Sequence, residues 1–387
     1  MNSNLSANII DYAVTTTIKN RMTRFLCAGV ALFVVGGGIP SASADGSNGF
    51  LPNQIIVSTV PPNGDLNPYG VAFVPEDFQR GTGPLQPGDI LVSNFNNSSN
   101  LQGTGITIVR VSRSGAVSLF FTAMTPAPGT TGNGLSTALA VLRKGFIIVG
   151  SVPSIDGTAA TVRPGGLLVI DSAGNLVSTI TDPKIKGPWD MTLLDEGNQA
   201  IAFISNVLTG TVVRLDLSVA TNGVTVTKKT VIASGYQHRG DPAAFEVGPT
   251  GLVYDLDRDV LFVAATEDNA VFAVQGAATR TSSGGKGSVI YRDVTHLHGP
   301  LGMAEAPNGH LLVANSDVIN SDPNQPSEIV EFTKQGQFIK QLSVDPAQGG
   351  SFGLAVRANE ETAFFAAVDD NTATLTVWKI SLSSDDQ

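Results

Sequence analysis

The chain reads Gly299-Pro-Leu-Gly-Met-Ala-Glu-Ala-Pro-Asn-Gly-His-Leu-Leu-Val-Ala-Asn-Ser-Asp317 through one unit of a pattern that recurs six times between residue 66 and the end. In each unit a turn rich in Gly and Pro leads into a short apolar strand. A second turn follows, and then a second strand that ends in a small polar residue. The second strands show the recurrence best, and they are Asp89–Asn94, Gly145–Gly150, Ala202–Asn206, Leu261–Thr266, Leu311–Asn315 and Phe364–Asp369. Self-similarity at a period of about fifty residues, with only strand-like segments, predicts a β-propeller.

The repeats predict an all-β fold with six blades, each of them a four-stranded antiparallel sheet. The innermost strand of each blade is expected where small residues follow Gly or Pro, at Pro68–Phe73, Leu135–Ala140, Pro188–Leu193, Thr250–Tyr254, Pro300–Ala304 and Ser351–Val356. The sixth repeat ends after its third strand, whereas Gln54–Val60 lies upstream of the first repeat and has no partner of its own. We therefore predict that Gln54–Val60 completes the last blade and closes the ring, which leaves no open sheet edge there.

The first 44 residues have the features of a secretory signal peptide. Three basic residues precede the uncharged apolar run Phe25–Ile39, and an Ala-x-Ala site ends at Ala44. We expect cleavage after Ala44, a single propeller domain over residues 45–387, and a secreted or periplasmic location. With the signal removed, no segment is expected to associate with a membrane.

Composition excludes several classes of function. Cys27 is the only cysteine and lies in the predicted signal, so the mature chain has no disulfide and no thiolate metal site. The formal net charge of the whole chain is −10, and no basic cluster follows the signal. Nucleic acid is therefore disfavoured as a partner. We expect a monomer that binds a protein, peptide or saccharide.

Candidate site residues gather where the strand ends of a propeller surround the mouth of its central channel, the usual pocket of this fold. The expected binding residues are Tyr69, Asn94, Trp189, Asn206, His296, Asn315 and Phe352. Oxygen ligands predominate there, which favours a hard cation such as Ca²⁺, with Asp190, Asn206, Asn315 and His298 as its candidate ligands. The alternative for the recurrent asparagines is that they satisfy backbone groups in the turns that follow the second strands.

Two polar clusters stand out from the repeats. In an extended segment, His296-Leu-His298 places both rings on one side, where they bind a metal, shuttle a proton or simply line the channel. His238-Arg-Gly-Asp241 lies in the long insert between the third and fourth blades, which either reaches over the face as a lid or forms a solvated loop.

The stretch Gly299–Asp317 and the strand Asp89–Asn94 resemble NHL repeats, and the likeness extends at repeat level over the mature chain. The chain is equally similar to the six-bladed group that includes the SMP-30/gluconolactonase and strictosidine synthase-like proteins. The lactonase branch of that group implies a divalent metal held by Glu, Asn and Asp at the channel. Here Lys186 stands where that branch has Asn, and Asn67-Pro-Tyr69 stands where it has Glu.

Two functions remain open from the sequence. The first is a binding module that uses its loop face, since no nucleophile elbow, zinc-protease motif or phosphate loop is present in the sequence. The alternative is a metal-dependent extracytoplasmic lactonase or esterase, with Asp190, His298 and Glu305 as candidate catalytic residues.

Overall fold

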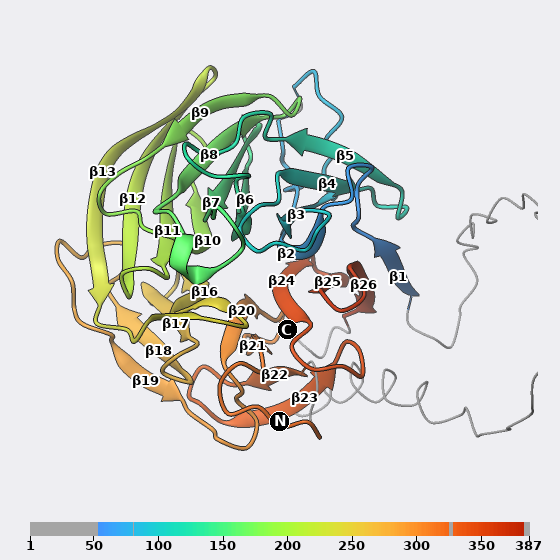
Figure 1. Ribbon diagram of the computed structural model, residues 1–387. Helices are drawn as coiled ribbons and strands as arrows, with labels where there is room; N and C mark the ends of the chain where they lie inside the picture. The colour runs from blue at the N-terminus through green and yellow to red at the C-terminus, as the bar shows by residue number, and fades with distance from the viewer. Residues whose placement is uncertain (1–52, 80, 325–327, 383–387) are drawn as a thin grey trace, which may run out of the picture.

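The computed structural model describes residues 53–79, 81–324 and 328–382, so the predicted signal peptide lies outside the described residues. It confirms a six-bladed β-propeller of four-stranded antiparallel blades (Figure 1). One short 3-10 helix, η1 (Ala159–Thr161), interrupts the strands. Within the described ranges, no helix has the length and apolar character needed to cross a membrane.

The strands of the first three blades follow chain order from the axis outward. Blade one contains β2 (Leu66–Phe73), β3 (Ile90–Asn96), β4 (Thr107–Val111) and β5 (Val117–Thr122). Blade two contains β6 (Leu135–Leu142), β7 (Phe146–Ser151), β8 (Gly166–Asp171) and β9 (Leu176–Ile180). Blade three contains β10 (Pro188–Asp195), β11 (Gln199–Asn206), β12 (Thr211–Ala220) and β13 (Gly223–Ser234).

A separate hairpin, formed by β14 (Arg239–Asp241) and β15 (Phe245–Val247), occupies the insert that follows blade three. Blade four contains β16 (Pro249–Asp255), β17 (Val260–Ala265), β18 (Ala270–Gln275) and β19 (Ser288–Tyr291). Blade five contains β20 (Pro300–Glu305), β21 (Leu311–Asn315), β22 (Glu328–Phe332) and β23 (Phe338–Ser343). Blade six contains β24 (Ser351–Ala358), β25 (Thr362–Asp369), β26 (Thr374–Ser381) and β1 (Asn53–Ser58).

The ring is closed both at the axis and at the rim. At the axis, the inner strand β2 contacts β6 on one side and β24 on the other. At the rim, β1 is the outermost strand of blade six and pairs antiparallel with β26, with Ser58 opposite Thr374. The first and last described strands of the chain therefore share one sheet, which Figure 1 shows at the blue and red ends of the colour scale.

The core lies between neighbouring blades, because the side chains of a strand alternate between its two faces. On β11, Ile204 packs against blade two in the same cluster as Ile148. The preceding residue, Phe203, packs in the opposite direction with Leu261 of blade four. Each blade thus contributes apolar side chains to two interfaces, and burial of these faces stabilises the ring.

A β-bulge recurs at the start of every inner strand. In blade five the register shifts between Pro300 and Met303, and the equivalent shifts occur in the other five blades. The bulge brings neighbouring inner strands close together, since a Cβ on Gly302 would lie 2.1 Å from the carbonyl oxygen of Phe352. The matching position in blade three is Asp190 instead of a glycine. The bulges therefore surround the axis with small residues, and Asp190 is a carboxyl group among them.

Substitution of Ile55 on β1 measures how much the packing of this strand stabilises blade six. Ile55 is partly buried against the cluster that contains Val377, whereas the adjacent Ile56 is 61% exposed. We expect Ile55→Ala to lower the free energy of unfolding by about 1–2 kcal/mol, less than for a fully buried isoleucine. Ile56→Ala is the matched control, and it should change the value by less than about 0.5 kcal/mol. Urea titration of both variants measures the difference, and equal effects would contradict this role for β1.

Candidate functional site

A layer of aromatic side chains crosses the central channel. Tyr69 lies at its centre, with ring centroids 4.9 Å from Phe95, 5.7 Å from Trp189 and 4.6 Å from Phe352. Phe245 of the insert hairpin joins the layer 5.6 Å from Phe95. Trp189 and Phe95 are fully buried. The predicted binding residue Trp189 is therefore part of this layer and lines neither of the two pockets described next.

The layer divides the channel into two pockets. Along β2, Asn67 and Tyr69 line one pocket, and Val71 lines the other. Along β24, Phe352 lines the first pocket and Leu354 the second. We call the first, on the side where the inner strands begin, the mouth pocket, and the second the channel pocket.

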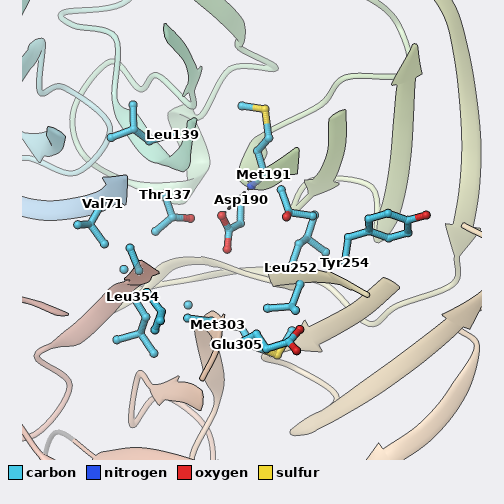
Figure 2. A pocket seen from close by; sticks show the side chains of 17 residues that line it. Val71, Thr137, Leu139, Asp190, Met191, Leu252, Tyr254, Met303, Glu305 and Leu354 are labelled. Carbon is cyan, nitrogen blue, oxygen red and sulfur yellow. Dashed lines mark hydrogen bonds between the residues drawn. The ribbon is translucent and has the colours of Figure 1, made fainter. Parts of the chain in front are cut away.

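The channel pocket has a volume of about 310 Å³ and holds two of the predicted catalytic residues, Asp190 and Glu305. Figure 2 shows the Asp190 carboxyl group pointing into this pocket among aliphatic side chains such as Leu139 and Leu252. Glu305 is the last residue of β20 and bonds to Lys334 at 2.7 Å. Lys334 also bonds to Asp255 at 2.8 Å, so Glu305 belongs to an ion-pair network.

Asp190 is held in an apolar environment. Its Oδ1 accepts a hydrogen bond from the backbone N–H of Met191 at 2.7 Å, and its own N–H donates to Ser205 Oγ at 3.0 Å. Burial raises the pKa of Asp190 well above its usual value, although backbone N–H groups of Met191 and Leu252 oppose the shift. A raised pKa favours the protonated form of a carboxyl group, which is able to donate a proton or a hydrogen bond.

The predicted histidine pair does not form a site. His298 is buried, and its ring nitrogens lie beside the carbonyl oxygens of Asn320 and, at 3.1 Å, Thr295. The His296 ring instead stacks on Phe338 with centroids 3.8 Å apart, and its Nδ1 lies 2.6 Å from Asp293. The two rings have different partners, and neither lines the mouth pocket or the channel pocket.

The recurrent asparagines bond to the segments that lead into the inner strands. Asn206 Nδ2 donates to Lys184 O at 3.0 Å, and Asn206 Oδ1 accepts from Lys186 N at 3.0 Å. Asn315 Nδ2 donates to His296 O at 2.8 Å, and Asn94 Nδ2 donates to the backbone of the segment after β1. All three are fully buried. They satisfy backbone groups, as the alternative expects, but these groups lie in the segments that lead into the inner strands and not in the turns that follow the second strands.

The candidate metal ligands are not brought together. Asn206 and Asn315 bond to the backbone of the connections that precede β10 and β20, Asp190 faces the channel pocket, and His298 lies in neither pocket. Across the part of the chain that the structure describes, no three His, Cys, Asp or Glu residues are arranged to hold a metal ion. As a set, the residues Asp190, Asn206, Asn315 and His298 therefore do not fit a divalent cation.

The mouth pocket is larger, with a volume of about 440 Å³, and it is rich in oxygen atoms. Tyr69 and Phe352, both predicted as binding residues, line it beside the aromatic layer. Three carboxylic acids and six side-chain amides line the rest, namely Glu246, Asp317, Asp370, Asn67, Asn96, Asn100, Gln102, Gln348 and Asn371. Among the described residues that line it there is no Lys, Arg or His.

Several of these acceptors have no hydrogen-bond partner in the described structure. Glu246 is 5% exposed, and no bond to its carboxylate is present within the described ranges. Burial raises the pKa of Glu246 to about 7. Asn67 and Asn96 each bury an Oδ1 atom without a partner. Unpaired buried polar groups are costly, so this part of the pocket has acceptors that a hydrogen-bond donor would satisfy.

Asp370 adds a further carboxyl group to the pocket. Burial, with the nearby charge of Asp369, raises the pKa of Asp370 to about 6. Burial also raises the pKa of the neighbouring Tyr69, and the charge of Asp370 adds to this shift. A negative charge at Asp370 therefore lies close enough to Tyr69 to affect its hydroxyl group.

The insert hairpin supplies the residues that the sequence did not identify. Its strand β15 contributes Phe245 to the aromatic layer and Glu246 to the mouth pocket. Gln102 of blade one donates to Ala243 O at 2.9 Å, and Arg239 pairs with Glu267 of blade four at 3.0 Å. The insert thus reaches over the face, as in the lid alternative. The charged run His238–Asp241 was the only sign of this in the sequence.

Comparison with known proteins finds no family and only distant structural neighbours. No protein-family model matches the chain, and no curated protein matches its sequence. A luciferin-regenerating enzyme is similar in structure at a TM-score of 0.49 and 12% identity, over 86% of this chain and 96% of that one. The calcium-binding protein regucalcin from Agrobacterium tumefaciens is similar at 0.48 and 14%, over 84% and 93%. Virginiamycin B lyase from Staphylococcus aureus, solved with quinupristin, is similar at 0.44 and 12%, over 85% and 100%.

Proposed function

We propose that this propeller is a binding module that holds its ligand in the mouth pocket. The observation that carries the proposal is the set of buried acceptors without partners, above all Glu246, in a pocket of about 440 Å³. Because the aromatic layer closes the inner end, a ligand enters and leaves by the mouth. A pocket of this size accommodates one or two units of a peptide or saccharide, or an end group of a larger protein partner.

The proposal includes a location outside the cytoplasm for this protein. The signal-like segment at residues 1–44 supports export. The chain has no cysteine after Ala44, so its fold does not depend on a disulfide bond in any compartment. A secreted or periplasmic monomer would meet peptides or saccharides released outside the cytoplasm.

A metal-dependent hydrolase is the second candidate, and Asp190 is the observation that favours it. Burial raises the pKa of its carboxyl group, which points into the channel pocket (Figure 2). That pocket lies beyond the aromatic layer, so a substrate of Asp190 would enter from the opposite end of the channel. The two candidates therefore use separate pockets, and variants in one pocket distinguish it from the other.

Ser321→Trp tests the binding module. Ser321 is an exposed residue at the edge of the mouth pocket, and an indole there fills part of the opening. We expect a peptide or saccharide that raises the melting temperature of the wild-type protein to give no shift with Ser321→Trp. Ser114→Trp, on an exposed turn of blade one, is the matched control and should bind normally.

The same variants decide between the two functions. Turnover of a lactone or ester that survives Ser321→Trp and is lost in Asp190→Asn would replace the binding module with the hydrolase. Ligand binding that is unchanged by Ser321→Trp would also contradict the proposed use of the mouth pocket.

A further inference from the structure

The mouth pocket has more acceptors than donors, and this imbalance says what kind of ligand it takes. Glu246 and Asp370 line the pocket, and no hydrogen bond to either carboxylate is present within the described ranges. The Oδ1 atoms of Asn67 and Asn96 are buried in the same pocket without partners. A ligand that satisfies these groups must donate several hydrogen bonds.

The negative charge of the mouth pocket also favours a ligand that donates hydrogen bonds. Three carboxylic acids line it, and no basic side chain is present among its described lining residues. Placing unpaired carboxylates in a buried site is unfavourable, and the raised pKa values of Glu246 and Asp370 reflect that cost. A cation that enters the pocket removes the cost, because it pairs with the ionised forms.

The aromatic rings at the base of the pocket suit a cation that carries carbon. Tyr69 and Phe352 lie with ring centroids 4.6 Å apart, and both line the mouth pocket. Ring faces attract an ammonium group by about 0.5–2 kcal/mol, depending on its desolvation. They also cover the methylene groups of an alkyl chain.

A bare metal ion fits these features less well. Nowhere in the described ranges do three acidic or histidine side chains converge as metal ligands. The volume of about 440 Å³ is far greater than a single ion needs, and part of the wall is aromatic. The carboxyl groups are distributed around a space the size of a small organic molecule.

We propose that the mouth pocket binds an alkyl-ammonium group, with Glu246 and Asp370 as its ionic partners, the Oδ1 atoms of Asn67 and Asn96 as acceptors, and Tyr69 and Phe352 beneath its carbon chain. This proposal rests on the mouth pocket being the binding site, and it names the chemical class of the ligand. The ammonium group belongs either to a free polyamine or to a lysine side chain of a peptide, and both present the same chemistry to the pocket.

Calorimetric titration of the mature protein, residues 45–387, tests the proposal. The probes are cadaverine and spermidine as free amines, and a short acetylated peptide with one lysine as the peptide source. We expect at least one of them to bind, with Glu246→Gln and Asp370→Asn each weakening its affinity at least tenfold. Glu196→Gln removes an exposed carboxylate outside the pocket, and it should leave the affinity unchanged. The tighter of the two kinds of probe identifies the source of the ammonium group.

The remaining outcomes overturn the proposal in distinguishable ways. A neutral saccharide or a lysine-free peptide that binds, and is blocked by Ser321→Trp, while no amine binds, would leave the binding module standing and remove the ammonium ligand. Ca²⁺ binding that depends on Glu246 and displaces the amine would replace the ammonium with a metal ion. Amine binding that neither Glu246→Gln nor Asp370→Asn weakens would place the ligand elsewhere on the acidic surface.

Discussion

The melting temperature of the wild-type protein is expected to fall as the pH rises from 5 to 8, and Glu328→Gln is expected to remove part of that fall. Glu328 is fully buried at the start of β22. Burial, together with the charges of Asp317 and Asp322, raises the pKa of Glu328 to about 8.

The sign follows from proton linkage. The folded state binds the Glu328 proton more tightly than the unfolded chain does, so stability is greatest below the ordinary glutamate pKa and is lost as the pH rises toward 8. Each unit of difference in pKa corresponds to about 1.4 kcal/mol. Among the described residues, the nearest basic group to this carboxylate is His298, whose Nε2 lies 3.9 Å from Glu328 Oε1.

Calorimetric melting at pH 5, 6, 7 and 8 measures the effect. The carboxyl groups of Asp190, Glu246, Asp369 and Asp370 have raised pKa values as well, so Glu328→Gln should reduce the slope without abolishing it. Glu196→Gln, at an exposed position, should keep the wild-type slope. A wild-type melting temperature that is constant or rises over this range would show that these groups are ionised without cost in the folded protein.

Trp189→Ala is expected to be the most destabilising single substitution in the aromatic layer. Trp189 is fully buried, and its ring centroid lies 5.5 Å from Phe95 and 6.5 Å from Phe245. Truncation of a buried tryptophan costs about 3–5 kcal/mol, because the cavity left behind loses packing on every side. The cavity would also weaken the barrier between the mouth pocket and the channel pocket.

Trp189→Phe is the control for this prediction. The Trp189 Nε1 atom is buried without an acceptor in the described structure, so phenylalanine removes an unsatisfied donor while keeping most of the ring. We expect a cost below about 2 kcal/mol for this variant. Urea unfolding of both variants gives the comparison, and a cost for Trp189→Ala below about 1 kcal/mol would mean that the layer contributes little to stability.

The blades were predictable from the sequence, and the site was predictable only in part. Strand patterns repeat with the blades, so Pro300–Ala304 and Leu311–Asn315 appear where the repeats place them. Tyr69 and Phe352 were identified because they begin inner strands, and this position puts them at the mouth. Site residues at positions that recur in every blade could therefore be identified from the repeat pattern.

Residues outside the repeat needed the structure. Glu246 and Phe245 lie in an insert without a counterpart in the other blades, and no periodicity indicates where a hairpin of that length points. The histidine pair was predicted on the assumption of an extended segment. The chain turns at Thr295 and His296 instead, so the two rings diverge. In both cases the outcome depends on loop conformation, which a repeat pattern does not specify.

The pairing of β1 with β26 has a consequence for the order in which the molecule forms. Thr59 and Ala373, 314 residues apart, are joined by a hydrogen bond, so the earliest strand of the propeller is completed only by the latest. During synthesis β1 has no partner until nearly the whole chain has been made, and bringing such distant segments together is slow. Blade six is therefore expected to form late, after the other five blades have been made.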